Sequence, residues 1–197
     1  MRSAALHLPC ITKQEPLFFN NLRRVGVYPR RRVILKNNVI MAQVEINKNI
    51  HLSEHFTLGE MCITSAKTQD GNVPSHVHIE NLKRLCGWLE MLRSEWNKRY
   101  GEGNDPIIIN SGYRSPAVNK SVGGVGTSNH LTGCAVDIRV AGIEQLIRYA
   151  TILLDISDEA CVDFDELLIE KNAHGAIWLH FAVRASNNRR KVLIINA

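Results

Sequence analysis

The spacing of apolar residues predicts two helices that each bury one face. The longer helix covers about residues 76–100 and starts after Pro74-Ser75, and the other covers residues 142–156. In the longer helix the apolar positions recur every three or four residues, at Leu82, Leu85, Cys86, Leu89, Leu92 and Trp96. Upstream of it, Thr57 and Glu60 have the spacing of a capping box, which predicts a further short helix.

Runs that are rich in β-branched and aromatic residues predict short strands. The run at residues 107–111 is interpreted as a central strand that ends at the Ser111-Gly112 step. Two later runs are separated by a short turn, which predicts that they are antiparallel neighbours in one sheet. These two runs lie at residues 164–170 and 177–183, and further strands are expected at residues 134–140 and 192–195.

Composition is that of a globular protein. The chain has 197 residues, of which 45% are hydrophobic and 22% charged, so we expect a domain with a sizeable core. No apolar run approaches the roughly 20 residues that a membrane-spanning helix needs. The first 40 residues also lack the apolar core and cleavage site of a secretory signal.

The formal net charge of +5 is concentrated near the start of the chain. Residues 1–40 carry eight Lys or Arg and one acidic residue, and the rest of the chain is slightly acidic. The charge therefore gives no support for a nucleic-acid-binding domain. We interpret residues 1–40 as a basic leader, either a disordered tail or a start-site artefact preceding Met41, with a functional basic arm as the alternative. Residues 41–197 are expected to form one catalytic domain.

The strongest candidate chemistry lies at residues 128–137, in the run S-N-H-L-T-G-C-A-V-D. His130 and Asp137 lie seven residues apart in this run, and both side chains are good ligands for Zn²⁺. A catalytic zinc ion usually has three protein ligands and one water, so a third ligand must come from elsewhere. The best candidate is His180, because it lies in the predicted strand at residues 177–183 and so has a set direction.

These motifs, taken in order, resemble those of the zinc D-alanyl-D-alanine carboxypeptidase family. That family includes phage peptidoglycan endopeptidases, and the Hedgehog signalling domain shares its fold. The resemblance rests on S-x-H-x-x-G-x-A-x-D at residues 128–137, W-x-H at 178–180, S-G-Y-R-S at 111–115 and V-G-G at 122–124. It implies an α+β fold, in which a small, mainly antiparallel sheet has helices packed on one face and the zinc cleft on the other.

The resemblance also implies roles for residues beside the metal ligands. Arg114 is expected to bind the substrate's carboxylate or to stabilise the oxyanion of the transition state. A structural ion pair of Arg114 with Asp137 or Asp105 is the alternative. Ser128 is expected to hydrogen-bond the substrate or to orient His130.

Amide hydrolysis needs a general base, and Glu170 is the candidate. It lies near the end of the strand that is predicted to pair with the strand of His180. The resemblance is incomplete here, because many related enzymes have E-x-x-H, whereas Ile177 stands at that position and Glu170 precedes His180 by ten residues. Glu166 lies on the same face of a regular strand as Glu170, so Glu166, with its neighbour Asp165, remains an alternative base.

The sequence thus predicts a zinc metallopeptidase that hydrolyses D-Ala-D-Ala or related D-amino-acid bonds in peptidoglycan stem peptides, as a D,D-carboxypeptidase or an endolysin-like enzyme. One alternative is an endopeptidase that cuts an L-to-D cross-bridge with the same metal chemistry. The other is a catalytically inactive metal-binding module, as in the Hedgehog domain. Without a signal peptide, such an enzyme is expected to be cytoplasmic or to be released during phage lysis.

Overall fold

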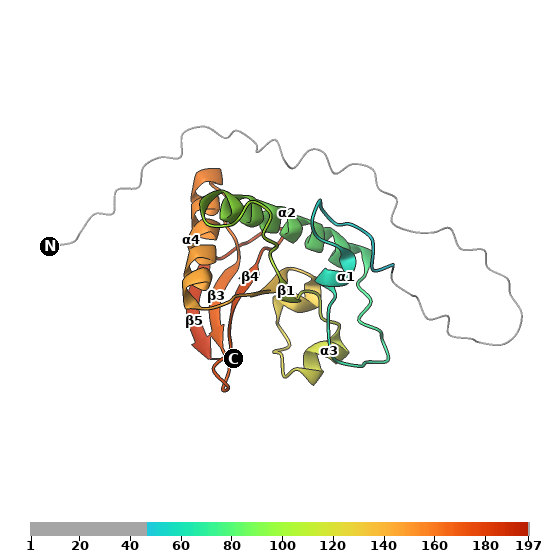
Figure 1. Ribbon diagram of the computed structural model, residues 1–197. Helices are drawn as coiled ribbons and strands as arrows, with labels where there is room; N and C mark the ends of the chain where they lie inside the picture. Colours follow the sequence, from blue (N-terminus) through green and yellow to red (C-terminus); the bar gives the residue numbers. More distant parts are fainter. Residues whose placement is uncertain (1–46, 197) are drawn as a thin grey trace, which may run out of the picture. The chain divides into compact units, whose positions relative to one another are not determined.

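The computed structural model describes residues 47–196, which form an α+β fold (Figure 1). The predicted basic leader at residues 1–40 lies outside the described residues. The described chain contains a five-stranded sheet with the strand order β1-β2-β4-β3-β5. All neighbouring strands are antiparallel except β3 and β5, which are parallel. The predicted fold class, a small and mainly antiparallel sheet with packed helices, is therefore confirmed.

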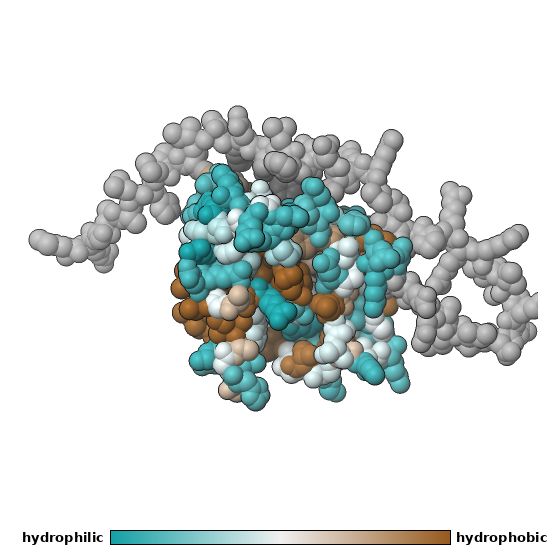
Figure 2. Space-filling view, viewed as in Figure 1, coloured by the Kyte–Doolittle hydropathy of each residue, from teal (hydrophilic) through white to brown (hydrophobic). Residues whose placement is uncertain are grey.

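The strands lie within about two residues of the predicted runs. Their bounds are β1 Ile109–Ser111, β2 Ala135–Arg139, β3 Glu166–Lys171, β4 Ile177–Ala182 and β5 Lys191–Asn196. The antiparallel pairing of β3 with β4 confirms the hairpin that the sequence predicted. Strand β5 exposes Val192, Leu193 and Ile194, which form an apolar patch over β5 in the space-filling view (Figure 2).

The prediction that the run at residues 107–111 forms a central strand is wrong, because β1 lies at one edge of the sheet and pairs with β2. The physical reason is that β-branched composition favours strands in general and does not distinguish an edge from a central position. Ile107 and Ile109 are buried, whereas Ile108 is 44% exposed, so this strand has one face open to solvent. Between Ile109 and Ser111 the register shifts, which places Ser111 opposite Asp137.

The helices begin at the residues that the sequence marked. The short helix α1 (Leu58–Met61) has the predicted capping box of Thr57 and Glu60, and α2 (His76–Arg99) is capped by Ser75. Two shorter segments follow, α3 (Pro116–Ser121) and the 3₁₀ helix η1 (Asn129–Thr132). Helix α4 (Ile143–Ala160) runs four residues beyond the predicted end. No helix in the described part of the chain is long and apolar enough to cross a membrane.

The two faces of the sheet have different characters. Phe181 of β4 packs against Trp88 of α2, with ring centroids 5.4 Å apart, and against Phe164 at 5.5 Å. Helices α2 and α4 contact each other and lie on β2 and β4, so this face is the core (Figure 1). Because side chains alternate along a strand, the neighbours of Phe181 point to the other face. That face carries His180, which lies directly opposite Asp137 in the pairing of β4 with β2.

Candidate metal centre

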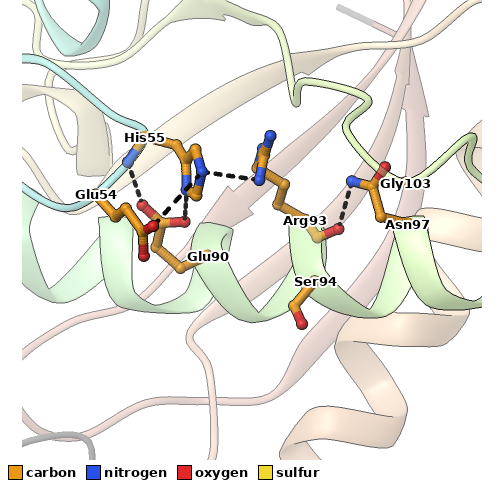
Figure 3. Close-up of a pocket in the computed structure, with 7 residues that line it drawn as sticks. All are labelled: Glu54, His55, Glu90, Arg93, Ser94, Asn97 and Gly103. Atoms are coloured by element: carbon orange, nitrogen blue, oxygen red, sulfur yellow. Dashed lines mark hydrogen bonds and ion pairs between the residues drawn. The ribbon is translucent and has the colours of Figure 1, made fainter.

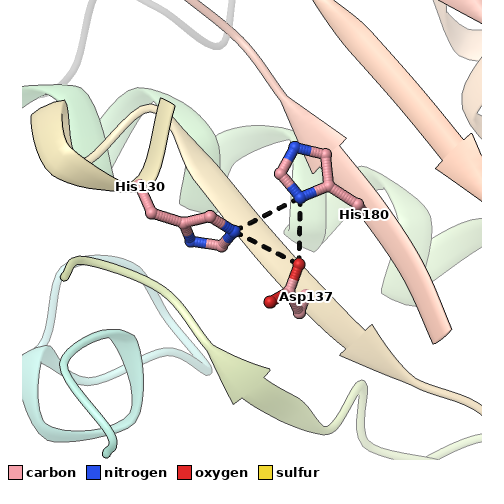
Figure 4. Close-up of side chains that lie close together, drawn as sticks. All are labelled: His130, Asp137 and His180. Carbon is pink, nitrogen blue, oxygen red and sulfur yellow. Dashed lines mark hydrogen bonds and ion pairs between the residues drawn. The ribbon is translucent and has the colours of Figure 1, made fainter. Parts of the chain in front are cut away.

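Three side chains from three different elements meet on the face away from the core helices. His130 comes from η1, Asp137 from β2 and His180 from β4 (Figure 4). His130 Nε2 lies 3.2 Å from Asp137 Oδ1 and 3.2 Å from His180 Nδ1, and the last two atoms are 2.9 Å apart. All three residues are buried.

The donor atoms are spaced closely enough to share one zinc ion. Zinc ligands lie about 2.0–2.2 Å from the ion in a tetrahedron, so two ligands should be about 3.3 Å apart. The observed edges of 2.9–3.2 Å are close to that value. Two imidazole nitrogens and one carboxylate oxygen also form a ligand set typical of zinc. Among the described residues, this is the one group of three histidine, cysteine or acidic side chains close enough to share a metal ion.

His130 is held through its ring and through its backbone. Its Nδ1–H donates to the carbonyl oxygen of Gly112 at 2.6 Å, which leaves the lone pair of Nε2 for a metal. The residue sits in a one-turn helix that is capped by Ser128, whose Oγ accepts a hydrogen bond from the backbone N–H of His130 at 3.3 Å. Gly133 ends this helix with φ +70°, in the left-handed region.

Asp137 is held by the S-G-Y-R-S segment. Arg114 Nη2 donates to Asp137 Oδ2 at 2.5 Å, and Arg114 Nε donates to the Oγ of Ser111 at 2.8 Å. This bond occupies one carboxylate oxygen and leaves Oδ1 facing the two histidines. The register shift between Ile109 and Ser111 brings Ser111 opposite Asp137. The ion pair between Arg114 and Asp137 that the sequence left as an alternative is thus present in the structure.

The family model for Peptidase M15 matches residues 54–154, which is just over half of the chain. The matched part contains His130 and Asp137. The chain belongs to the Peptidase M15 family. No curated protein matches the chain. Membership makes the protein a metallopeptidase, and M15 peptidases are generally zinc-dependent, which agrees with the donor set described above. The match ends before β3 and β4, so the positions of His180 and Glu170 come from the structure alone.

The histidines of this M15 peptidase differ in their protonation. Burial lowers the pKa of His130 below its ordinary value, although Asp137 opposes the shift, so this ring is neutral near pH 7. Burial acts in the same direction on His180, but its hydrogen bond with Asp137 and the negative charges of Asp137 and the nearby Glu166 raise its pKa to about 9. Burial would raise the pKa of Asp137, yet the two histidines hold it well below its ordinary value. A metal cation would therefore displace a proton from His180.

Glu170 lies on the face of the sheet that carries the donor atoms. In the pairing of β3 with β4, Leu168 lies opposite His180 and Glu170 lies opposite Trp178. Side chains two residues apart on a strand point to the same face, so Glu170 points to the face of His180. Burial raises the pKa of the Glu170 carboxyl, and the negative charge of Asp137 adds to this shift. The charges of His180 and Arg114 partly oppose it.

Glu166 occupies the same face but has a different environment. Its Oε1 accepts from Arg189 Nη2 at 2.8 Å, and its Oε2 accepts from Asn129 Nδ2 at 2.9 Å. The neighbouring His180 and a hydrogen bond from Asn129 lower the pKa of Glu166 to about 2, although burial opposes this. No local pattern marks Asn129 or Arg189 as a partner of Glu166, because Arg189 lies 23 residues after Glu166 in the basic turn at residues 186–191.

A polar pocket along α2 has a structural explanation (Figure 3). His55 Nδ1 lies 2.8 Å from Glu90 Oε2, and His55 Nε2 lies 3.0 Å from Arg93 Nη1. The backbone N–H of His55 also donates to Glu90 Oε1 at 2.7 Å. These contacts fasten the segment before α1 onto α2. The pocket is lined by Glu54, His55, Glu90, Arg93, Ser94, Asn97 and Gly103.

Proposed function

We propose that this M15 peptidase is a zinc enzyme that hydrolyses D-Ala-D-Ala or a related D-amino-acid bond in peptidoglycan stem peptides. One observation carries the proposal: a buried triangle of two imidazole nitrogens and a carboxylate oxygen, with a carboxyl of raised pKa, Glu170, on the same face of the sheet. A zinc ion with three protein ligands supplies a bound water whose pKa is lowered to about 7.

Glu170 is the general base in this proposal. A base works best when its pKa lies near the working pH, and burial moves the pKa of Glu170 in that direction. Glu166 is less suited to the role, because its carboxylate is already bonded to Asn129 and Arg189 and its pKa is about 2. We therefore assign proton transfer from the water to the leaving amine to Glu170.

Arg114 is assigned to the substrate. Two of its guanidinium nitrogens are used within the protein, Nε by Ser111 and Nη2 by Asp137. Its Nη1 makes no hydrogen bond to the described residues and can donate to a terminal carboxylate or to the developing oxyanion. The side chain is 18% exposed, so a substrate can reach it. Ser128 caps η1 through its Oγ, which supports its role in orienting His130.

The test is D-alanine release from a stem pentapeptide by the zinc-loaded protein and by its Glu170→Gln variant. Loss of a general base typically lowers the rate by 10²–10⁴-fold, so we expect a fall of at least about 100-fold with zinc content unchanged. The matched control is Glu159→Gln, which removes an exposed carboxylate at the end of α4 and should retain full activity.

The same assay separates the alternatives. Cleavage of cross-linked fragments without release from the pentapeptide would make the protein a cross-bridge endopeptidase with the same metal centre. Bound zinc without hydrolysis of either substrate would contradict the enzymatic proposal and indicate a metal-binding module. Unchanged activity of Glu170→Gln would show that another group acts as the base.

A further inference from the structure

One ring nitrogen of His180, Nε2, is buried without a hydrogen-bond partner, and metal binding through the other nitrogen does not explain this. Its Nδ1 faces Asp137 Oδ1 and His130 Nε2, whereas its Nε2 is buried and has no hydrogen-bond partner. The nearest acidic atom is Oε2 of Glu166, 3.7 Å away, which is too long for a hydrogen bond but within ion-pair range. Buried polar groups are nearly always paired, so this nitrogen needs an explanation.

Glu166 is fixed in position from several directions. Its side chain is 14% exposed, and it is the first residue of β3, on the same face as His180. Arg189 and Lys191 approach Oε1 at 2.8 Å and 3.5 Å, and Asn129 donates to Oε2 at 2.9 Å. A carboxylate oxygen can accept two hydrogen bonds, so Oε2 has a remaining lone pair beside His180 Nε2.

The neighbouring Asp165 strengthens this support. It is fully buried and is bonded by Arg189 Nε at 2.8 Å and by Arg184 Nη2 at 2.7 Å. Asn129 Nδ2 donates to Asp165 Oδ2 at 2.8 Å as well as to Glu166. Asn129 directly precedes His130 in η1. Its hydrogen bonds to Asp165 and Glu166, together with those of Arg189, form one network that connects η1, the start of β3 and the turn at residues 186–191.

We propose that Glu166 is a positioning residue that accepts the Nε2–H of His180 and so directs the lone pair of Nδ1 to the metal. The two histidines then have opposite tautomers. His130 donates through Nδ1 to the Gly112 carbonyl and binds through Nε2, whereas His180 donates through Nε2 to Glu166 and binds through Nδ1. Such outer partners commonly fix the ring orientation of metal-binding histidines. The proposal rests on the zinc site of the proposed function, and it gives Glu166 and Glu170 separate tasks.

The first measurement is zinc affinity, by competition with a chromophoric chelator at constant pH. Loss of an outer-shell partner typically weakens metal binding by about 10–100-fold, and we expect that loss for Glu166→Ala. Glu166→Gln keeps an oxygen that can accept the Nε2–H, so it should recover most of the affinity. Glu170→Gln and the surface control Glu159→Gln should bind zinc as the wild type does. Thermal unfolding of the metal-free variants shows which of them are folded.

The second measurement is the tautomer of His180 by ¹⁵N nuclear magnetic resonance of the zinc-loaded protein. We expect a slowly exchanging Nε2–H in the wild type and in Glu166→Gln, and rapid exchange of that proton in Glu166→Ala. Wild-type affinity and an unchanged Nε2–H signal in Glu166→Ala would overturn the positioning role. A large fall in activity of Glu166→Ala with intact zinc affinity would overturn it as well, because it would make Glu166 the base. Failure of the wild type to bind zinc would instead overturn the proposed function.

Discussion

Gly112 is the residue at which a single added methyl group should disturb both the fold and the metal centre. A Cβ at this position would lie 2.3 Å from the carbonyl oxygen of Met61 and 3.0 Å from its carbonyl carbon, whereas ordinary contacts begin at 3.4 Å. Met61 is fully buried at the end of α1, and the obstructing atoms are backbone. In Gly112→Ala the end of β1 and α1 must therefore separate by about 1 Å, as overpacked cores do.

The expected cost can be worked out from the contacts that this movement disturbs. Overpacking typically costs about 1–3 kcal/mol. The backbone hydrogen bond from Tyr113 N to Met61 O, at 2.7 Å, would weaken at a further cost of about 1 kcal/mol. We expect a total loss of about 2–4 kcal/mol in the free energy of unfolding. For a urea m-value of about 2 kcal/mol/M, this lowers the unfolding midpoint by about 1–2 M.

The same movement should weaken zinc binding, because the Gly112 carbonyl accepts the Nδ1–H of His130 at 2.6 Å. Displacement of that partner should lower zinc affinity by about 10–100-fold. The matched control is Gly126→Ala, since a Cβ at Gly126 meets nothing within 4 Å. Its stability should change by less than about 0.5 kcal/mol. A Gly112→Ala protein with the stability and zinc affinity of Gly126→Ala would refute this reasoning.

Two further predictions concern stability away from the metal. Gly87 lies inside α2 with nothing within 4 Å of an added Cβ, so Gly87→Ala should raise the free energy of unfolding by about 0.5–1 kcal/mol, and a lower urea midpoint would contradict this. Burial would raise the pKa of Asp165, but hydrogen bonds from Arg189 and Arg184 hold it well below its ordinary value. Its stabilising contribution is therefore complete above the unfolded pKa of about 3.9 and is lost as pH falls from there through the folded pKa. Asp165→Asn should cost about 3 kcal/mol at pH 7 and progressively less below pH 4, and parallel stability–pH curves for the two proteins would count against this.

The parts of the fold that depend on local patterns could be predicted from the sequence. Helix α2 begins and ends within one residue of the predicted bounds, because its apolar stripe and the Ser75 cap are both local signals. The capping box of Thr57 and Glu60 is a local signal of the same kind. The edge position of β1 could not be predicted from a local pattern. A β-branched run of this length is compatible with either an edge or a central strand.

In the candidate metal site, too, some features follow from local sequence patterns and others depend on contacts between distant residues. His130, Asp137 and His180 were predicted from their ligand chemistry and, for His180, from its place in a strand, and the three side chains do converge. The pairing of β2 with β4, which sets Asp137 opposite His180, was not predicted. The tasks of the residues around them depend on distant contacts. Arg189 reaches Glu166 from a turn that follows β4, and no local pattern marks that contact. The need for glycine at position 112 likewise becomes visible only when α1 is placed against β1.

The most direct test of the account is X-ray absorption spectroscopy of the zinc-loaded protein, together with its metal content. The account predicts one zinc ion per chain with nitrogen and oxygen ligands at about 2.0–2.1 Å, two of them imidazoles, and loss of bound zinc in His180→Ala. A zinc–sulfur distance of about 2.3 Å would show a cysteine ligand, and zinc retained by His180→Ala would place the metal elsewhere. Either result would contradict the assignment of His130, Asp137 and His180 as the metal centre of this M15 peptidase.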